Sequence, residues 1–194
     1  MVGYPVREKI VVSKNGGQRN IAGVSNSVLT SLQLSNASKV LDVKKIAFVF
    51  NPRETNSSLQ LQDMLNVSKE QGYEVVPLRV RPDVAVYREY LAKVSAIQGL
   101  SAVYLPSDSF LISHAKDVLA LLNERKIPTI CSAAPYLKEG CLVGTSSNYI
   151  ALGRIAAGIL DKHQKGQPLE DIPVMYDTNA FSTINEDVLQ ALGL

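Results

Sequence analysis

From Lys45 onward, two patterns of apolar and polar positions alternate along the chain. Short runs rich in β-branched and aromatic residues are separated by longer stretches in which apolar residues recur with a helical period. The short runs predict strands at 46–50, 73–80, 102–105, 129–132, 142–145 and 174–176. The longer stretches predict four helices, whose core-facing positions are Leu61, Met64, Leu65 and Ser68; Val84, Tyr87, Leu91 and Val94; Leu111, Ala115, Val118 and Leu122; and Tyr149, Leu152, Ala156, Ile159 and Leu160.

Strands and helices that alternate this often predict an α/β fold: an open, mostly parallel, Rossmann-like sheet with helices on both faces. Helix-ending signals such as Gly72 and Pro128 fall between the predicted elements. The first forty residues differ. There, Gly16-Gly17 predicts a turn, 21–25 a strand and 27–40 a modest helix, while the apolar segment before the turn has no evident partner.

Composition limits the function classes. The 194 residues suffice for one good-sized domain or two small ones. A net charge of +2, from 20 basic and 18 acidic residues without charged blocks, argues against a surface for nucleic acid or anionic membranes. The sequence contains no apolar run of the length that spans a bilayer. The segment MVGYPVREK lacks the features of a secretory signal, so the protein is either cytoplasmic or has its leader outside this sequence.

The two cysteines, Cys131 and Cys141, are ten residues apart. Two cysteines at that spacing do not suit zinc, which is bound by close pairs. Because unpaired cysteines are so often buried, the pattern favours two structural thiols over a disulfide. No metal or other cofactor is expected.

Ligands of open parallel sheets bind where the strands end and the next helices begin. The loop after the first predicted strand reads NPRETNSS and contains Asn51, Glu54, Asn56 and Ser57. Capping of one helix cannot account for all four polar side chains. This loop is therefore the first candidate for a binding site.

Polar residues also follow three later strands. Asp108 either caps the next helix or meets the ammonium group of a ligand, and both alternatives stay open. Ser132 begins the loop after the fourth strand. After the fifth strand, Ser147 or Asn148 is expected to cap the next helix.

Patterns of enzyme chemistry are weak. The first strand is followed by no glycine-rich phosphate loop, and Gly144-Thr145-Ser146-Ser147 lacks the second glycine of a nucleophile elbow. His114 is expected inside a helix without a neighbouring nucleophile, and His163 on the surface near a helix C-terminus. No catalytic residue is predicted. A small enzyme that uses Asp108 and a loop serine is the weakest hypothesis.

Several segments together resemble a known family. In chain order they are NIAGVSNSV at 20–28, NPRETNSS at 51–58, YLPSDSF at 104–110, KIPTICS at 126–132, NYIALGR at 148–154 and KGQPLEDIPV at 165–174. They resemble ABC-transporter substrate-binding proteins of the tryptophan, tyrosine and phenylalanine type, which have two periplasmic-binding-protein-like lobes. The resemblance covers nearly the whole chain.

The resemblance implies that residues 1–20 are the remnant of a first lobe with its crossing segment, and that 21–194 form the C-terminal lobe. It implies a cleft lined by the loop after the first strand, and an α-ammonium group paired with Asp108. Tyr149 matches the family's tyrosine but lacks its usual acidic neighbour, and Ala133-Ala134-Pro135 replaces a stretch that often carries an acidic or hydroxyl residue.

The leading hypothesis is thus a non-enzymatic solute-binding component of an ABC transporter, binding an amino-acid-like, aromatic molecule and delivering it to a permease. By resemblance its place is periplasmic or extracellular with a lipid anchor. The alternative is an intracellular ligand-sensing or regulatory domain of the same fold that acts by dimerisation. Because an isolated lobe would expose the apolar surface that the other lobe covers, self-association is also expected.

Overall fold

The protein is described by a computed structural model that covers residues 3–13, 15, 20–177 and 180–194. The chain forms two compact units. The smaller unit comprises Met1–Val28 and Ser147–Phe181, and the larger unit comprises Leu29–Ser146 and Ser182–Leu194. The expected division into a first-lobe remnant at 1–20 and a C-terminal lobe at 21–194 concerns the origin of each segment and stays a prediction.

The larger unit is built on a six-stranded sheet in the order β3-β2-β4-β5-β6-β8. Its strands are β2 (Lys45–Phe50), β3 (Glu74–Arg79), β4 (Ala102–Leu105), β5 (Thr129–Cys131), β6 (Val143–Ser146) and β8 (Phe181–Ile184). The pairs β2–β3, β2–β4, β4–β5 and β5–β6 are parallel. The predicted mostly parallel α/β sheet is therefore confirmed, and its parallel strands end at one edge.

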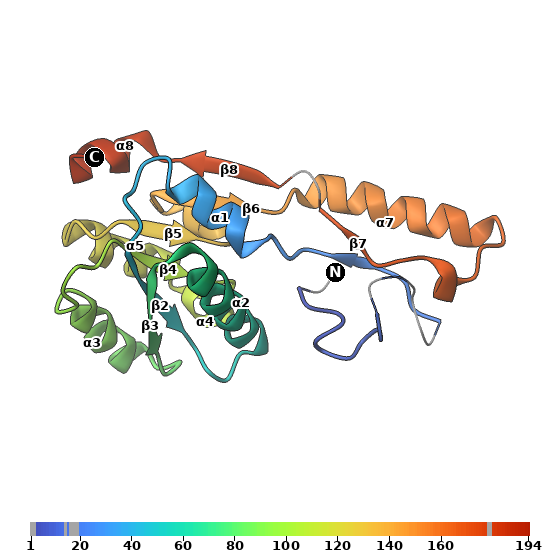
Figure 1. Ribbon diagram of the computed structural model, residues 1–194, viewed down its shortest axis with the longest axis horizontal. Helices are drawn as coiled ribbons and strands as arrows, with labels where there is room; N and C mark the ends of the chain where they lie inside the picture. Colours follow the sequence, from blue (N-terminus) through green and yellow to red (C-terminus); the bar gives the residue numbers. More distant parts are fainter. Residues whose placement is uncertain (1–2, 14, 16–19, 178–179) are drawn as a thin grey trace. The chain divides into compact units, whose positions relative to one another are not determined.

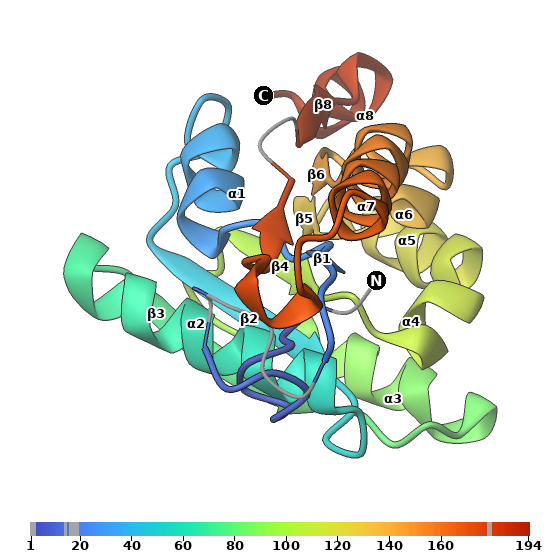
Figure 2. The ribbon, with the colours of Figure 1, turned by 90° about the vertical axis from the view of Figure 1, so that its right-hand side faces the viewer.

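Helices cover both faces of this sheet (Figures 1 and 2). The helices of the larger unit are α1 (Thr30–Ala37), α2 (Thr55–Gln71), α3 (Val84–Val94), α4 (Ser109–Ser113), α5 (Ala115–Glu124), α6 (Ala134–Lys138) and α8 (Glu186–Leu192). Helices α1, α2 and α8 contribute to the core on one face, and α3, α4, α5 and α6 to the core on the other. Alternate side chains of β2 illustrate the division, since Phe48 belongs to the first core and Val49 to the second.

Two predicted helices differ in detail. The helix expected across 111–122 is interrupted at His114, which ends α4 and begins α5. The Nδ1 atom of His114 lies 2.9 Å from the Phe110 carbonyl oxygen, so the imidazole bonds to the turn before it. Helix α3 agrees with the prediction, and its Leu91 and Val94 are fully buried. The side chains of Val84 and Tyr87, and the Gly16-Gly17 turn, lie outside the described parts of the structure.

The smaller unit is centred on α7 (Tyr149–Gln164). Strands β1 (Val24–Ser25) and β7 (Met175–Tyr176) pair in parallel, so the strand predicted at 174–176 joins β1 rather than the main sheet. The 3-10 helix η1 (Leu169–Asp171) links α7 to β7. The buried cluster of the smaller unit consists of Val24, Leu152, Ile159 and Ile172. Among the described residues, no helix has both the length and the apolar composition required to cross a membrane.

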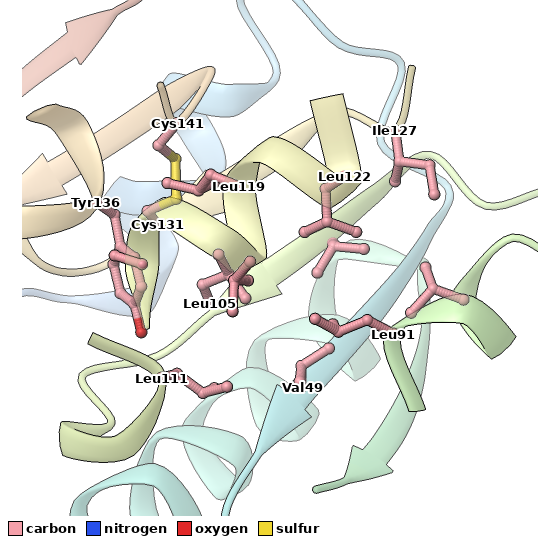
Figure 3. Close-up of a cluster of buried hydrophobic side chains, with 14 of the residues drawn as sticks. Val49, Leu91, Leu105, Leu111, Leu119, Leu122, Ile127, Cys131, Tyr136 and Cys141 are labelled. Carbon is pink, nitrogen blue, oxygen red and sulfur yellow. A yellow bond between two sulfur atoms is a disulfide. The ribbon is translucent and has the colours of Figure 1, made fainter. Parts of the chain in front are cut away.

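The cysteines contradict the prediction of two free thiols. Cys131, at the end of β5, and Cys141, just before β6, form a disulfide with a Cα–Cα distance of 6.4 Å, and both are fully buried (Figure 3). The prediction was wrong because sequence spacing does not show that β5 and β6 are neighbours. Their register pairs Cys131 with Gly144, three residues beyond Cys141, which brings the two sulfur atoms together.

Replacing both cysteines with alanine (Cys131→Ala with Cys141→Ala) should lower the free energy of unfolding by about 3 kcal/mol, because the unfolded chain loses a cross-link that closes a short loop. Urea denaturation measures this change. A reducing agent should lower the stability of the wild type and leave that of the double variant unchanged. Equal denaturation midpoints for the two proteins without reductant would contradict the prediction.

Candidate functional site

The predicted site residues divide between the two units. Asn51, Glu54, Asn56, Ser57, Asp108 and Ser132 belong to the larger unit, whereas Tyr149 belongs to the smaller one. The six residues of the larger unit follow β2, β4 and β5, which are neighbouring parallel strands. The fold therefore gathers these three loops at the carboxyl edge of the sheet, where an α/β sheet binds its ligands.

Asp108 fastens two of these loops together. Its Oδ2 accepts hydrogen bonds from the Asn51 backbone N–H at 2.9 Å and from the Ser57 hydroxyl at 2.6 Å. Its Oδ1 accepts from the Leu111 backbone N–H at 3.1 Å. Asp108 is fully buried, as is Ser57. The carboxylate is thus an internal bridge from β4 to the loop after β2.

One of the two alternative roles expected of Asp108 is seen in the structure. Its bond from Leu111 is the N-cap of α4, so the expected capping role is confirmed. Pairing of Asp108 with a ligand ammonium group remains a prediction. The carboxylate already accepts three hydrogen bonds, so the ammonium group would have to use a further lone pair of its oxygens.

Glu54 forms a second bridge between the same loops. Its two carboxylate oxygens accept from the backbone N–H of Ser109 at 2.8 Å and from the Ser109 hydroxyl at 2.9 Å. Glu54 occupies the N-cap position of α2 but makes no side-chain bond to that helix. Unlike Asp108, it is only half-buried, so this carboxylate combines an internal role with access to solvent.

Asn56 has an unsatisfied group. Its Oδ1 is enclosed and accepts no hydrogen bond from the described residues. An enclosed carbonyl oxygen without a donor costs free energy of the order of 1–3 kcal/mol. Asn56 lies in the first turn of α2, where an additional donor would stabilise this acceptor.

Gln60 is a site residue that sequence reasoning missed. Its Oε1 accepts from the Ser107 backbone N–H at 2.8 Å and from the Ser132 hydroxyl at 3.4 Å, and its Nε2 donates to the Tyr104 hydroxyl at 3.4 Å. The Tyr104 hydroxyl in turn donates to Gln33 of α1. Gln60 is buried and follows Asn56 by four residues on α2, a helical spacing that could have identified it.

Tyr136 is the second residue that was missed. It is fully buried, and its hydroxyl donates to the Pro106 carbonyl at 3.1 Å. Burial raises the pKa of Tyr136 well above its ordinary value, and the nearby negative charges of Asp108 and Glu54 raise this pKa further. The phenol therefore stays protonated and acts as a donor.

The smaller unit places Tyr149 at the start of α7, with 52% of its surface exposed. Its hydroxyl accepts from the side-chain amide of Asn26 at 3.2 Å. Asn148 caps α7 by accepting from the Ala151 N–H at 3.1 Å, as expected. The neighbouring Ser147 hydroxyl donates to the Asn26 carbonyl at 2.8 Å.

The part of the chain that the structure describes contains no group of three or more histidine, cysteine, aspartate or glutamate side chains that could hold a metal ion. The arrangement at the sheet edge instead offers carboxylate and amide oxygens held by internal hydrogen bonds. Such a surface suits recognition of a ligand that donates hydrogen bonds.

The sequence comparisons identify the family of this chain. A sequence model described as ABC transporter substrate binding protein matches residues 1–194. A tyrosine-binding protein of Clostridioides difficile (strain R20291) is 29% identical over 193 residues, which are 98% of this chain and 54% of that protein. The chain therefore spans about half the length of this curated relative.

Two solved structures share the fold. A ligand-free, open substrate binding protein with adhesive properties from Clostridium difficile has a TM-score of 0.84 and 25% identity, covering 100% of this chain and 65% of that one. An ABC domain from Streptococcus pneumonia in complex with L-Trp has a TM-score of 0.83 and 23% identity, covering 98% and 64%.

Replacing Asp108 with alanine should lower the free energy of unfolding by about 3 kcal/mol, because three buried donors lose a charged acceptor. Urea denaturation provides the measurement. The matched control is Asp42→Ala, since Asp42 forms an exposed ion pair with Lys44 and its loss should change stability little. A stable Asp108→Ala variant would show that the bridge between the loops is dispensable.

Proposed function

Because the chain belongs to the family of ABC transporter substrate binding proteins, we propose that it is the solute-binding component of such a transporter, or the C-terminal lobe of one. Its solute is an amino acid, and an aromatic one is favoured by the relatives that bind tyrosine and L-Trp. The role is capture and delivery to a permease, with no chemical step. The division into a first-lobe remnant at 1–20 and a C-terminal lobe at 21–194 remains part of this proposal.

One observation carries the proposal: the loops after β2 and β4 are locked together by Asp108, while Glu54 and Asn56 keep capacity to accept hydrogen bonds. An amino acid brings an ammonium group with three N–H donors. The half-buried carboxylate of Glu54 and the enclosed oxygen of Asn56 are acceptors of the type that this group requires. Asp108, Asn51, Ser57 and Ser132 are retained as proposed ligand residues of the larger unit, and Tyr149 is retained as a proposed ligand residue of the smaller unit.

The disulfide supports a place outside the reducing cytosol. Disulfides form and persist in oxidising compartments, and Cys131–Cys141 is fully buried in the core. This favours the periplasmic or extracellular location that is typical of the family.

The proposal is tested by ligand binding to the chain itself. In a thermal-shift screen of the twenty amino acids and a panel of nucleotides, we expect a selective rise in melting temperature with L-tyrosine, L-tryptophan or L-phenylalanine, because these ligands bind only the folded state. D-tyrosine serves as a control of equal apolar surface. A shift with nucleotides alone, or with no compound, would contradict the proposed function of this chain.

Glu54 provides a sharper test of the site. Glu54→Gln removes one negative charge and should weaken binding of the L-amino acid at least tenfold, because a charge-assisted hydrogen bond becomes a neutral one. The matched control is Glu74→Gln, which removes the same charge at the opposite end of the strands, where Glu74 pairs with Lys45. Isothermal titration calorimetry compares the affinities. Equal affinities for the two variants would exclude Glu54 from the binding site.

A further inference from the structure

We propose that the loop closed by the Cys131–Cys141 disulfide is a positioning element for the strand-end site, and that Tyr136 is the residue through which it acts. The loop runs from Cys131 at the end of β5 through α6 to Cys141, two residues before β6. None of the residues assigned to ligand contact lies within it except Ser132. Its effect on the site must therefore pass through contacts with the neighbouring loops.

The first contact is the hydroxyl of Tyr136. It donates to the Pro106 carbonyl, which also accepts from the Asp108 backbone N–H at 2.8 Å. Pro106 directly follows β4 and stands two residues before Asp108. Tyr136 thus fixes the peptide that determines where the Asp108 carboxylate lies. Because Tyr136 is fully buried, no solvent competes for this hydrogen bond.

The second contact lies at the start of the loop. The Ser132 backbone N–H donates to the Leu105 carbonyl at 3.1 Å, and the Ser132 hydroxyl donates to Gln60. The loop is consequently bonded to two successive carbonyl groups of one segment, those of Leu105 and Pro106. Both bonds hold the chain immediately before Asp108.

The rest of the loop is fixed to the sheet. The disulfide joins its two ends, and the Tyr136 ring belongs to the same buried cluster as the sulfur atoms and Leu105 (Figure 3). Leu137 packs so closely on β6 that a Cβ atom added to Gly144 would lie 1.9 Å from its Cδ2. A covalent link and a close apolar contact therefore leave α6 little freedom to move. Tyr136 is held rigidly, as a positioning residue must be.

This arrangement predicts that loss of the Tyr136 hydroxyl loosens the Asp108 bridge while the sheet stays intact. The consequence for ligand affinity rests on the proposed function, but the consequence for the bridge does not. Two backbone amides report on the bridge directly: the N–H groups of Asn51 and Leu111, both of which donate to Asp108. The N–H of Val103, which donates to Pro128 inside the sheet, reports on global stability.

The test is amide hydrogen exchange measured by NMR on the full chain with Tyr136→Phe. Protection at Asn51 and Leu111 should fall at least tenfold more than protection at Val103. Tyr73→Phe is the matched control, because the Tyr73 hydroxyl is enclosed and bonds to none of the described residues. Tyr73 precedes β3, at the end of the strands remote from the site, so its variant should leave the Asn51 and Leu111 amides unchanged.

The double variant Cys131→Ala with Cys141→Ala should also lose amide protection at Asn51 and Leu111. This loss should exceed the loss at Val103, which measures the change in global stability. If protection at these two amides follows Val103 in both variants, the positioning role is overturned. Calorimetry measures the affinity of each variant for L-tyrosine. Tyr136→Phe should weaken this affinity at least threefold, and Tyr73→Phe should not change it.

The two proposals can fail separately. If the wild type does not bind L-tyrosine but the selective loss of protection occurs, the positioning role is supported and the proposed function fails. If the wild type binds and Tyr136→Phe binds equally well, the loop does not position the site, whatever its contribution to stability.

Discussion

The buried carboxylate of Asp108 is the interaction on which the strand-end site depends. A carboxylate removed from water must replace its hydration with hydrogen bonds, and this one accepts them from the loop after β2, the first turn of α2 and the first turn of α4. The carboxylate and its hydrogen-bond donors depend on each other. The carboxylate is stable only if Asn51, Ser57 and Leu111 reach it, and these groups are held together only because it is there. A loop of polar residues that could adopt many conformations is thereby restricted to one, and the entropic cost of ordering it is met during folding rather than during binding.

Polar residues at the sheet edge then divide into two kinds. Asp108 and Gln60 are buried, and their contacts connect loops to one another. Glu54 is half-buried, so solvent reaches its carboxylate, whereas the enclosed oxygen of Asn56 has no donor among the described residues. Rigid internal bonds behind partly unsatisfied acceptors are the arrangement that a preorganised binding site needs. The same residue types in sequence therefore serve different purposes, and burial decides which purpose each one serves.

Most of the sheet could be predicted from sequence, because apolar runs such as 46–50 and 102–105 are buried on both sides and leave a strong pattern. The site was predicted as a group of loops, since parallel strands must end at one edge. What the pattern could not supply was pairing in space. The roles of Gln60 and Tyr136 depend on partners 47 and 30 residues away. The break at His114 arises from its bond to the Phe110 carbonyl, which no apolar period reveals.

The disulfide is the clearest example of a pairing in space that the sequence pattern could not supply, and it also bears on the proposed site. Ten residues of separation are compatible with two free thiols until β5 and β6 are known to be neighbours in a defined register. Once they are, the cross-link closes the segment that carries Tyr136 and begins with Ser132, so a covalent bond in the core lies one residue from a predicted ligand contact. Short-range covalent closure constrains a loop more firmly than hydrogen bonds alone, because it does not open when water competes. A protein that folds where disulfides persist can therefore keep its binding loops in place with a small number of buried contacts behind them.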